Sequence, residues 1–233
     1  MNTPSISDIE PAYGAMNADG WIPARPILEY ALGVDLGQSF DPTSLCLLEH
    51  RRDPILPVGA DLIQKLTPSR YIVRHLSRVA LGTSYVAIAR IVGGVLARPE
   101  IRRNCELVID RTGVGRAVAD IFTQAGLSFT GVTITSGDGE KSDGEGGYRV
   151  GKLSLVSRLQ AEFHSKSLRL PKDLPEAGAL VTELQNFRAT ISDAGHATFG
   201  ARVGAHDDLV LSLALALWYF THGGAWTTEP LAL

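Results

Sequence analysis

Residues 32–50, LGVDLGQSFDPTSLCLLEH, contain two short apolar runs separated by a segment that is rich in Gly, Asp and Pro. Turn-forming residues between two apolar runs predict a β-hairpin. The first run carries Asp35 near its end, inside what is otherwise a buried strand. An Asp before a Gly commonly shapes a turn, so this carboxylate has a structural as well as a functional interpretation.

The rest of the chain predicts an α/β fold. Three consecutive strands followed by strands that alternate with helices predict a mixed, five-stranded sheet with helices on both faces and an added hairpin. A Gly-rich polar loop is expected at residues 136–147. The expected strands are at 27–36, 43–50, 70–81, 105–110, 128–135 and 168–171, the helices at 83–104, 114–126, 152–165, from about 175 and at 207–222, and the hairpin at 187–201.

Composition and length limit the class of protein. The chain has 233 residues, 45% of them hydrophobic, which suits one domain, expected at 29–223. Residues 1–28 and 224–233 are expected to be a flexible arm or linker remnant and a tail. The net charge of −3 argues against binding nucleic acid through bulk charge. Two Cys and no long apolar segment favour a cytoplasmic protein without a membrane span.

Carboxylates stand at three positions that hydrophobic patterning alone does not explain. Asp35 lies in the first strand, Asp110 ends the run ELVID, and the pair Asp207 and Asp208 opens the last helix. Turn formation and helix capping are alternative roles for each residue taken singly. Together, however, they would form a cluster of negative charge that requires a cation. Oxygen ligands alone favour Mg²⁺ or Mn²⁺, and two such ions support phosphodiester hydrolysis with water as the nucleophile.

Three segments resemble the nuclease domain of the terminase large subunit of tailed bacteriophages, within the RNase H-like and RuvC-like superfamily. They are GVDLGQSFDPTSL, LVIDRTGVGRAVADIF and GAHDDLVLSLALALW, and the resemblance spans residues 30–222. It implies an RNase H-like fold, two Mg²⁺ or Mn²⁺ ions, and Asp35, Asp110 and Asp208 as their ligands. Asp207 is an alternative ligand or a neighbour that supports one, and His206 either contacts a bound water or phosphate or merely flanks the helix.

The resemblance also implies a function in phage genome packaging. It predicts a metal-dependent endonuclease that cuts double-stranded DNA in the host cytoplasm. The implied partners are a packaging ATPase, a small terminase subunit and a portal. This sequence contains no G-x-x-x-x-G-K-[ST] loop, so ATP-driven translocation is not predicted for this polypeptide.

A local excess of basic residues predicts where DNA would bind. Residues 149–172 contain six Lys and Arg against a single acid, Glu162. Lys and Arg contacts to phosphates are the usual source of sequence-independent affinity, although a solvated helix face would have the same composition. The predicted DNA-binding residues are Arg149, Lys152, Arg158 and Lys166.

Three other functions remain alternatives at this point. One is a RuvC-like resolvase that acts on branched DNA, since the same motifs suit it. Another is a nucleotide-binding protein of the actin and sugar-kinase fold, because DLGQS resembles its first phosphate loop; no second phosphate loop follows, however. The last is a catalytically silent DNA-binding module, which retention of all three acids makes less attractive.

Overall fold

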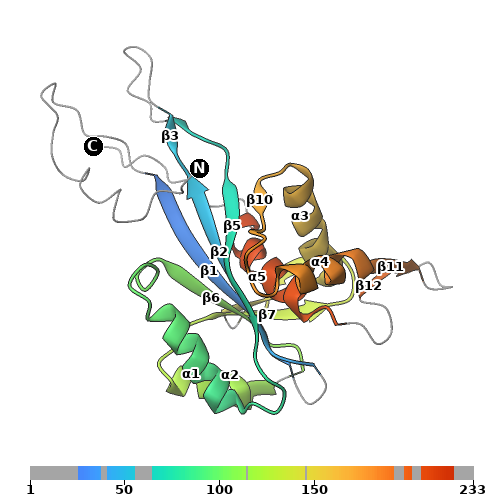
Figure 1. Cartoon of the computed structure of the whole chain (residues 1–233). Coiled ribbons are helices and arrows are strands. Elements are labelled where there is room, and N and C mark those ends of the chain that lie inside the picture. Colours follow the sequence, from blue (N-terminus) through green and yellow to red (C-terminus); the bar gives the residue numbers. More distant parts are fainter. Residues whose placement is uncertain are drawn as a thin grey trace, which may run out of the picture.

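The computed structural model describes residues 26–37, 41–55, 65–113, 115–144, 146–191, 197–200 and 206–222. Its centre is a mixed sheet of eight strands in the order β10-β5-β2-β1-β6-β7-β9-β8 (Figure 1). β1 pairs antiparallel with β2 and parallel with β6. The strands of this sheet are β1 (Ile27–Asp35), β2 (Ser44–Arg52), β5 (Arg70–Arg78), β6 (Cys105–Asp110), β7 (Thr130–Thr135), β8 (Glu140–Ser142), β9 (Gly147–Gly151) and β10 (Leu168–Arg169).

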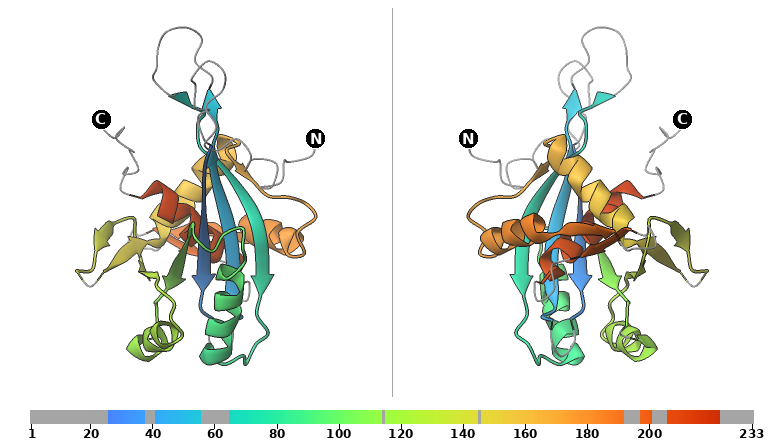
Figure 2. Two further views of the ribbon diagram at one scale, coloured as in Figure 1. Left: turned by 90° about the vertical axis from the view of Figure 1, so that its left-hand side faces the viewer. Right: turned by 90° about the vertical axis from the view of Figure 1, so that its right-hand side faces the viewer.

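Helices cover both faces of the sheet, as the sequence predicted. α1 and α2 pack on one face against a core that contains Leu32, Leu45 and Phe122. α3 and α5 pack on the other face, where Trp218 is fully buried, and α4 packs against α5 (Figures 1 and 2). The helices are α1 (Tyr85–Leu96), α2 (Gly115–Gln124), α3 (Lys152–His164), α4 (Ala177–Asn186) and α5 (Asp208–Thr221).

The α/β fold is confirmed, and the sheet is larger than the five strands expected. The short strand expected at 168–171 is β10, at one edge of the sheet. The strands that were not expected are β8, at the other edge, and its neighbour β9, which fall in or beside the segment expected to be a loop. Glycine-rich composition hid them, since Gly has low intrinsic strand preference. The backbone of β9 nevertheless pairs in parallel with β7 and antiparallel with β8.

Two small hairpins lie outside the main sheet. The added hairpin predicted at 187–201 is present as β11 (Arg188–Ile191) and β12 (Ala197–Gly200), which pair antiparallel. In the right-hand view of Figure 2 it crosses in front of the sheet. The second hairpin joins β3 (Pro54–Ile55) to β4 (Lys65–Leu66). Most of the predicted arm (1–28) and the whole tail (224–233) lie outside the described residues.

Helix α5 is the central element of the core. From Asp208 to Trp218 every residue is buried, because the apolar run LVLSLALALW contacts β1, β2 and α3 at once. Gly33 of β1 lies against the α5 backbone: a Cβ there would lie 2.0 Å from the carbonyl oxygen of Ser212 and 2.8 Å from the amide nitrogen of Ala216. Glycine therefore allows the helix and the strand to meet main chain to main chain.

No helix among the described residues is long and apolar enough to cross a membrane.

Candidate functional site

Asp35 and Asp110 lie side by side at the ends of two parallel strands. The register of β1 and β6 pairs Val34 with Ile109, so each Asp is the next residue on its strand. Side chains alternate along a strand, and both carboxylates therefore face the side of the sheet that α5 covers. Crevices at the carboxyl ends of parallel strands are common ligand sites in α/β proteins.

The first turn of α5 brings the second pair of carboxylates to the same place. Asp207 is the residue before the helix and Asp208 begins it. The close approach of α5 to β1 at Gly33 places this end of the helix beside the end of the strand, near Asp35. The end of β1 and the start of α5, which are far apart in the sequence, thus lie side by side in the structure.

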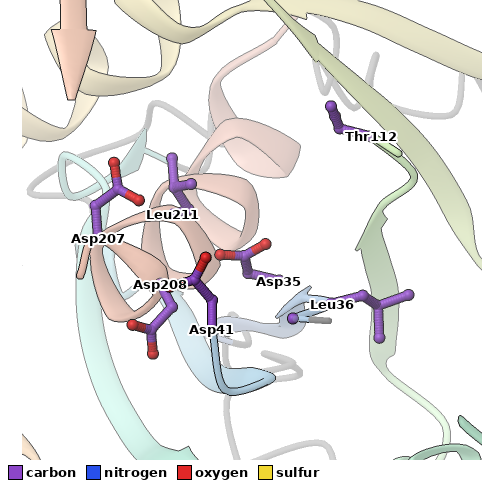
Figure 3. Close-up of a pocket in the computed structure, with 8 residues that line it drawn as sticks. Asp35, Leu36, Asp41, Thr112, Asp207, Asp208 and Leu211 are labelled. Atoms are coloured by element: carbon purple, nitrogen blue, oxygen red, sulfur yellow. The ribbon is translucent and has the colours of Figure 1, made fainter. Parts of the chain in front are cut away.

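A pocket of about 370 Å³ opens between these elements (Figure 3). Asp35 lies at its centre, between the start of α5 and the Thr112 side of the sheet, and Asp207 and Asp208 point to different sides of the helix. Acidic side chains dominate the polar part of the wall. The lining residues are Asp35, Leu36, Gly37, Asp41, Thr112, Asp207, Asp208 and Leu211.

The electrostatics of the pocket match those of a cation site. Burial, followed by the charges of Asp110, Asp207 and Asp208, raises the pKa of Asp35 well above its usual value. Burial also raises the pKa of Asp110, although hydrogen bonds from Thr112 oppose that shift. Several carboxylates with poor solvation and mutual repulsion gain stability from any cation that joins them.

Asp110 is held by its own turn. The amide nitrogen of Thr112 donates a hydrogen bond of 2.7 Å to Asp110 Oδ1, and the Thr112 hydroxyl donates to the same oxygen. The Thr112 hydroxyl also accepts a hydrogen bond of 2.8 Å from the amide nitrogen of Ile134. The turn role and the site role of Asp110 therefore coexist: one oxygen is engaged by the turn while the carboxylate remains beside Asp35.

Basic side chains hold the two Asp of the helix start. Lys152 Nζ donates to Asp207 Oδ2 at 2.6 Å, and Arg78 Nε donates to Asp208 Oδ2 at 2.8 Å. Asp208 is 3% exposed and Asp110 is 7% exposed, so both are core residues as well as site residues. Among the described residues, no three acidic, His or Cys side chains surround one point closely enough to hold a metal ion. The donor atoms suit a hard divalent cation, and binding one requires some of these side chains to turn.

The other predicted residues, His206 and the basic side chains, are not among the residues that line the pocket. His206 is exposed, and its Nδ1 lies 3.0 Å from Asp41 Oδ1 at the pocket wall. Arg149 is exposed on β9, and Lys166 is exposed just after α3. Arg158 hydrogen-bonds Glu140 at 2.7 Å and also donates to the carbonyl oxygen of Thr221, so its guanidinium is engaged within the protein. The four predicted DNA-binding residues thus lie on β9, at the start of α3, within α3 and just after α3.

Sequence reasoning missed three residues of this region. Asp41 has the sequence context of a turn residue, yet it lines the pocket between the ends of β1 and β2. Thr112 follows Asp110 by two residues, a spacing that permits the hydrogen bonds described above. Arg78 ends the strand β5, and no sequence signal links it to Asp208, 130 residues away.

Comparisons with known proteins show which proteins this chain is similar to. No protein-family model matches the chain. The terminase large subunit of Thermus virus P23-45 is 27% identical over 182 residues, which are 75% of this chain and 33% of that protein. The terminase large subunit of Thermus phage G20c is 26% identical over 183 residues. The chain thus spans about a third of the length of the curated relatives that it matches.

Solved structures give the same result for the fold. The large terminase nuclease from thermophilic phage G20c superposes with a TM-score of 0.57 and 23% identity, covering 81% of each chain. The structure of that nuclease with bound magnesium gives 0.58 and 24%, covering 83% of this chain and 82% of that one. The nuclease domain of the Thermus phage P74-26 large terminase gives 0.55 and 22%, covering 81% and 78%.

The chain therefore has an RNase H-like α/β fold. More specifically, it has the fold of the large-terminase nuclease domain, and the resemblance to the terminase large subunit that the three sequence motifs indicated is confirmed.

Proposed function

We propose that this chain is a metal-dependent endonuclease that cuts double-stranded DNA during phage genome packaging. The observation that carries the proposal is the convergence of Asp35 and Asp110, from adjacent parallel strands, with the Asp207 and Asp208 pair at the start of α5. Oxygen donors of this kind favour Mg²⁺ or Mn²⁺. The relatives are terminase large subunits, and one similar nuclease was solved with magnesium bound.

In this proposal Asp35, Asp110 and Asp208 hold two divalent ions, and Asp207 supports or replaces Asp208. Bound ions of this kind activate a water and stabilise the leaving oxygen of a phosphodiester. Asp35 has the central role, because it adjoins Asp110 in the strand register and lies near the helix start in the pocket (Figure 3). Asp41 and His206 lie at the rim, where a DNA strand would pass.

Basic side chains of the protein would bind the DNA phosphates. Lys152 adjoins Asp207 and supplies a positive charge near the place where a phosphate would lie. Arg149 and Lys166 are exposed and suited to phosphate contacts further along the strand, whereas Arg158 would first have to leave Glu140. Among the described residues, no Ser, Cys or Tyr lines the pocket, so water is the proposed nucleophile.

The biological setting is part of the proposal. The expected partners are a packaging ATPase, a small terminase subunit and a portal, all acting in the host cytoplasm. The domain assignment, a nuclease at 29–223 between an arm and a tail, is proposed with it. This chain matches only about a third of the length of the two terminase large subunits. The activities of the rest of those proteins are not assigned to it.

Cleavage of supercoiled plasmid tests the proposal. Purified chain is incubated with Mn²⁺, Mg²⁺ or EDTA, alongside the variants Asp35→Asn and Asp208→Asn. Asp53→Asn is the matched control, because Asp53 pairs with Arg51 and Arg70 at a distance from the pocket. We expect metal-dependent nicking or linearisation by the wild type and the control, and its loss in both site variants. Wild-type cleavage by both site variants would overturn the site assignment.

A four-way DNA junction serves as the second substrate. A packaging nuclease should cut linear duplex at least as fast as the junction. A strong preference for the junction would instead favour the resolvase-like alternative, while leaving the metal site in place. Absence of cleavage and of Mn²⁺ binding by the folded protein would favour a silent DNA-binding module.

A further inference from the structure

Arg78 joins the start of α5 to two other elements. It is the last residue of β5, and its guanidinium contacts three carboxylates. Nε donates to Asp208 Oδ2 at 2.8 Å and Nη1 donates to Glu176 Oε2 at 3.1 Å, while Nη2 donates to Glu183. Glu176 and Glu183 belong to the α4 region and Asp208 to α5, so one side chain links β5 to both helices.

Glu183 supplies a cap to α5 from outside that helix. Asp207 occupies the N-cap position, but its side chain makes no capping hydrogen bond. Instead the amide nitrogen of Val210, in the first turn, donates to Glu183 Oε2 at 3.1 Å. The first amide nitrogens of a helix need such acceptors, and the residue at the N-cap position usually provides them. Here Glu183 of the neighbouring helix α4 caps the start of α5. The side chains of Asp207 and Asp208 are therefore not used as caps.

A third contact fixes the same turn from the sheet. The Ser44 hydroxyl of β2 donates to the carbonyl oxygen of Asp208 at 2.6 Å. The backbone around Asp208 is therefore held by β2 and α4, and its carboxylate by β5. The position and the direction of this carboxylate are determined by residues outside α5.

The charge balance of this network differs from that of a stabilising ion pair. One guanidinium faces three carboxylates, and Glu183 and Asp208 are both buried. Burial, followed by the charge of Asp208, raises the pKa of Glu183 to about 7. An arrangement with surplus buried carboxylates is a poor way to stabilise a fold. The geometry of this network, in contrast, determines where Asp208 lies at the candidate metal site.

We propose that Arg78 and Glu183 are positioning residues, which fix the first turn of α5 and thereby set the direction in which Asp208 presents its carboxylate to the pocket. The inference rests on the proposed nuclease function and adds to it residues that do not themselves contact the substrate. Carboxylate ligands in metal sites are commonly held by further hydrogen bonds, and loss of these typically lowers metal affinity 10–100-fold.

A simple charge effect predicts the opposite result for Arg78. If Arg78 only neutralised its acidic neighbours, removing it would make the pocket more negative and would raise the affinity for a divalent cation. If Arg78 positions Asp208, removing it lowers that affinity despite the added negative charge. The sign of the change in affinity therefore separates the two roles.

Calorimetric titration of the full, EDTA-treated chain with Mn²⁺ measures this sign. We compare wild type, Arg78→Met and Arg78→Lys, which keeps the charge but loses the planar fork. The matched control is Arg74→Met, four residues earlier on β5, which breaks the hydrogen bonds of Arg74 to Glu49 of 2.7 and 2.9 Å. We expect both Arg78 variants to bind Mn²⁺ about 10–100-fold more weakly, and the control to bind like wild type.

Circular dichroism shows whether the Arg78 variants fold. If they do not, a second pair of variants, at Glu183, provides the test. Glu183→Gln retains a side-chain acceptor for Val210, whereas Glu183→Leu removes it. We expect Glu183→Gln to keep Mn²⁺ affinity within about 3-fold of wild type and Glu183→Leu to lose at least 10-fold. Tighter or unchanged binding by the Arg78 variants, or equal loss in both Glu183 variants, overturns the inference while wild-type binding stands. Absence of Mn²⁺ binding by the wild type overturns the proposed function and this inference together.

Discussion

Two of the three arginines of strand β5, Arg74 and Arg78, lie four residues apart and form very different clusters. Arg74 makes two hydrogen bonds to Glu49, and the Tyr30 hydroxyl lies 3.5 Å from the same carboxylate. Arg78 contacts Asp208, Glu176 and Glu183, next to a pocket that also contains Asp35 and Asp207. The first cluster balances one cation with one anion, whereas the second has surplus anions.

The difference separates a structural use of charge from a functional one. In a balanced, bidentate pair the arginine and the carboxylate satisfy each other's charge and hydrogen bonds, so no added ion is required. A cluster with surplus buried carboxylates is stabilised by an added cation, and the same surplus gives it affinity for that cation. Of these two clusters, the unbalanced one is therefore the better candidate for chemistry.

The largest expected effect comes from neutralising Asp35, at the centre of the pocket beside the unbalanced cluster. Asp35→Asn should reduce metal-dependent plasmid cleavage by about 10³-fold or more, because a metal site contributes several kcal/mol to such a reaction. The rate of nicking at saturating Mn²⁺ measures this. Glu49→Gln, the corresponding change in the balanced cluster, should leave the rate within a few-fold of wild type, and an equal loss in both variants would contradict the comparison.

The second effect is on stability and falls on the balanced cluster. Arg74→Met leaves Glu49 buried without its charge partner, which typically costs about 3 kcal/mol in the free energy of unfolding. Urea denaturation followed by circular dichroism measures it. Glu49 is 3% exposed, so water cannot readily replace the guanidinium. A loss below about 1 kcal/mol would mean that the pair adds little to the fold.

A smaller effect of opposite sign is expected for Asp35. In EDTA, Asp35→Asn should raise the melting temperature, since it removes one of several like charges that are close together. A gain of about 1 kcal/mol corresponds to about 2–4 °C for a domain of this size. Differential scanning calorimetry checks it, and saturating Mn²⁺ should reverse the order by stabilising the wild type alone. A lower melting temperature for the variant in EDTA would show that Asp35 supports the fold.

The smallest effect concerns the pH dependence of the balanced cluster. Burial, followed by the charge of Glu49, raises the pKa of Tyr30 from 10.0 to about 12. Between these values the folded protein retains a proton that the unfolded chain releases, so stability falls as pH rises through this window. The contribution is about 1 kcal/mol between pH 10 and pH 11. Tyr30→Phe should show a correspondingly shallower decline in urea denaturation at these two pH values; identical slopes would exclude this role.

Sequence patterns predicted much of the fold because local signals were strong in its centre. The two short apolar runs of β1 and β2, the compact run of β6 and the long apolar run of α5 were sufficient to predict a mixed sheet covered by helices. The edge strands β8 and β9 could not be predicted in the same way. β9 is held by backbone pairing to β7, and β8 by pairing to β9, rather than by a hydrophobic pattern of their own.

The candidate site was predictable only in part for a related reason. Asp35, Asp110, Asp207 and Asp208 stand at element boundaries, which local sequence reveals. Asp41 resembles an ordinary turn residue. The contacts of Arg78 with Glu183 and Asp208 join positions 105 and 130 residues apart, and no periodic pattern encodes such pairs.

The main-chain contact at Gly33 has a consequence for how this protein tolerates change. At Gly33 no side chain separates β1 from α5, so the spacing of the two elements at this point is set by main-chain contact. Substitutions elsewhere in the hydrophobic core can be absorbed by repacking of neighbouring side chains. At Gly33 there is no side chain to repack. Substitutions in the surrounding core should therefore change the distance between Asp35 and the first turn of α5 very little.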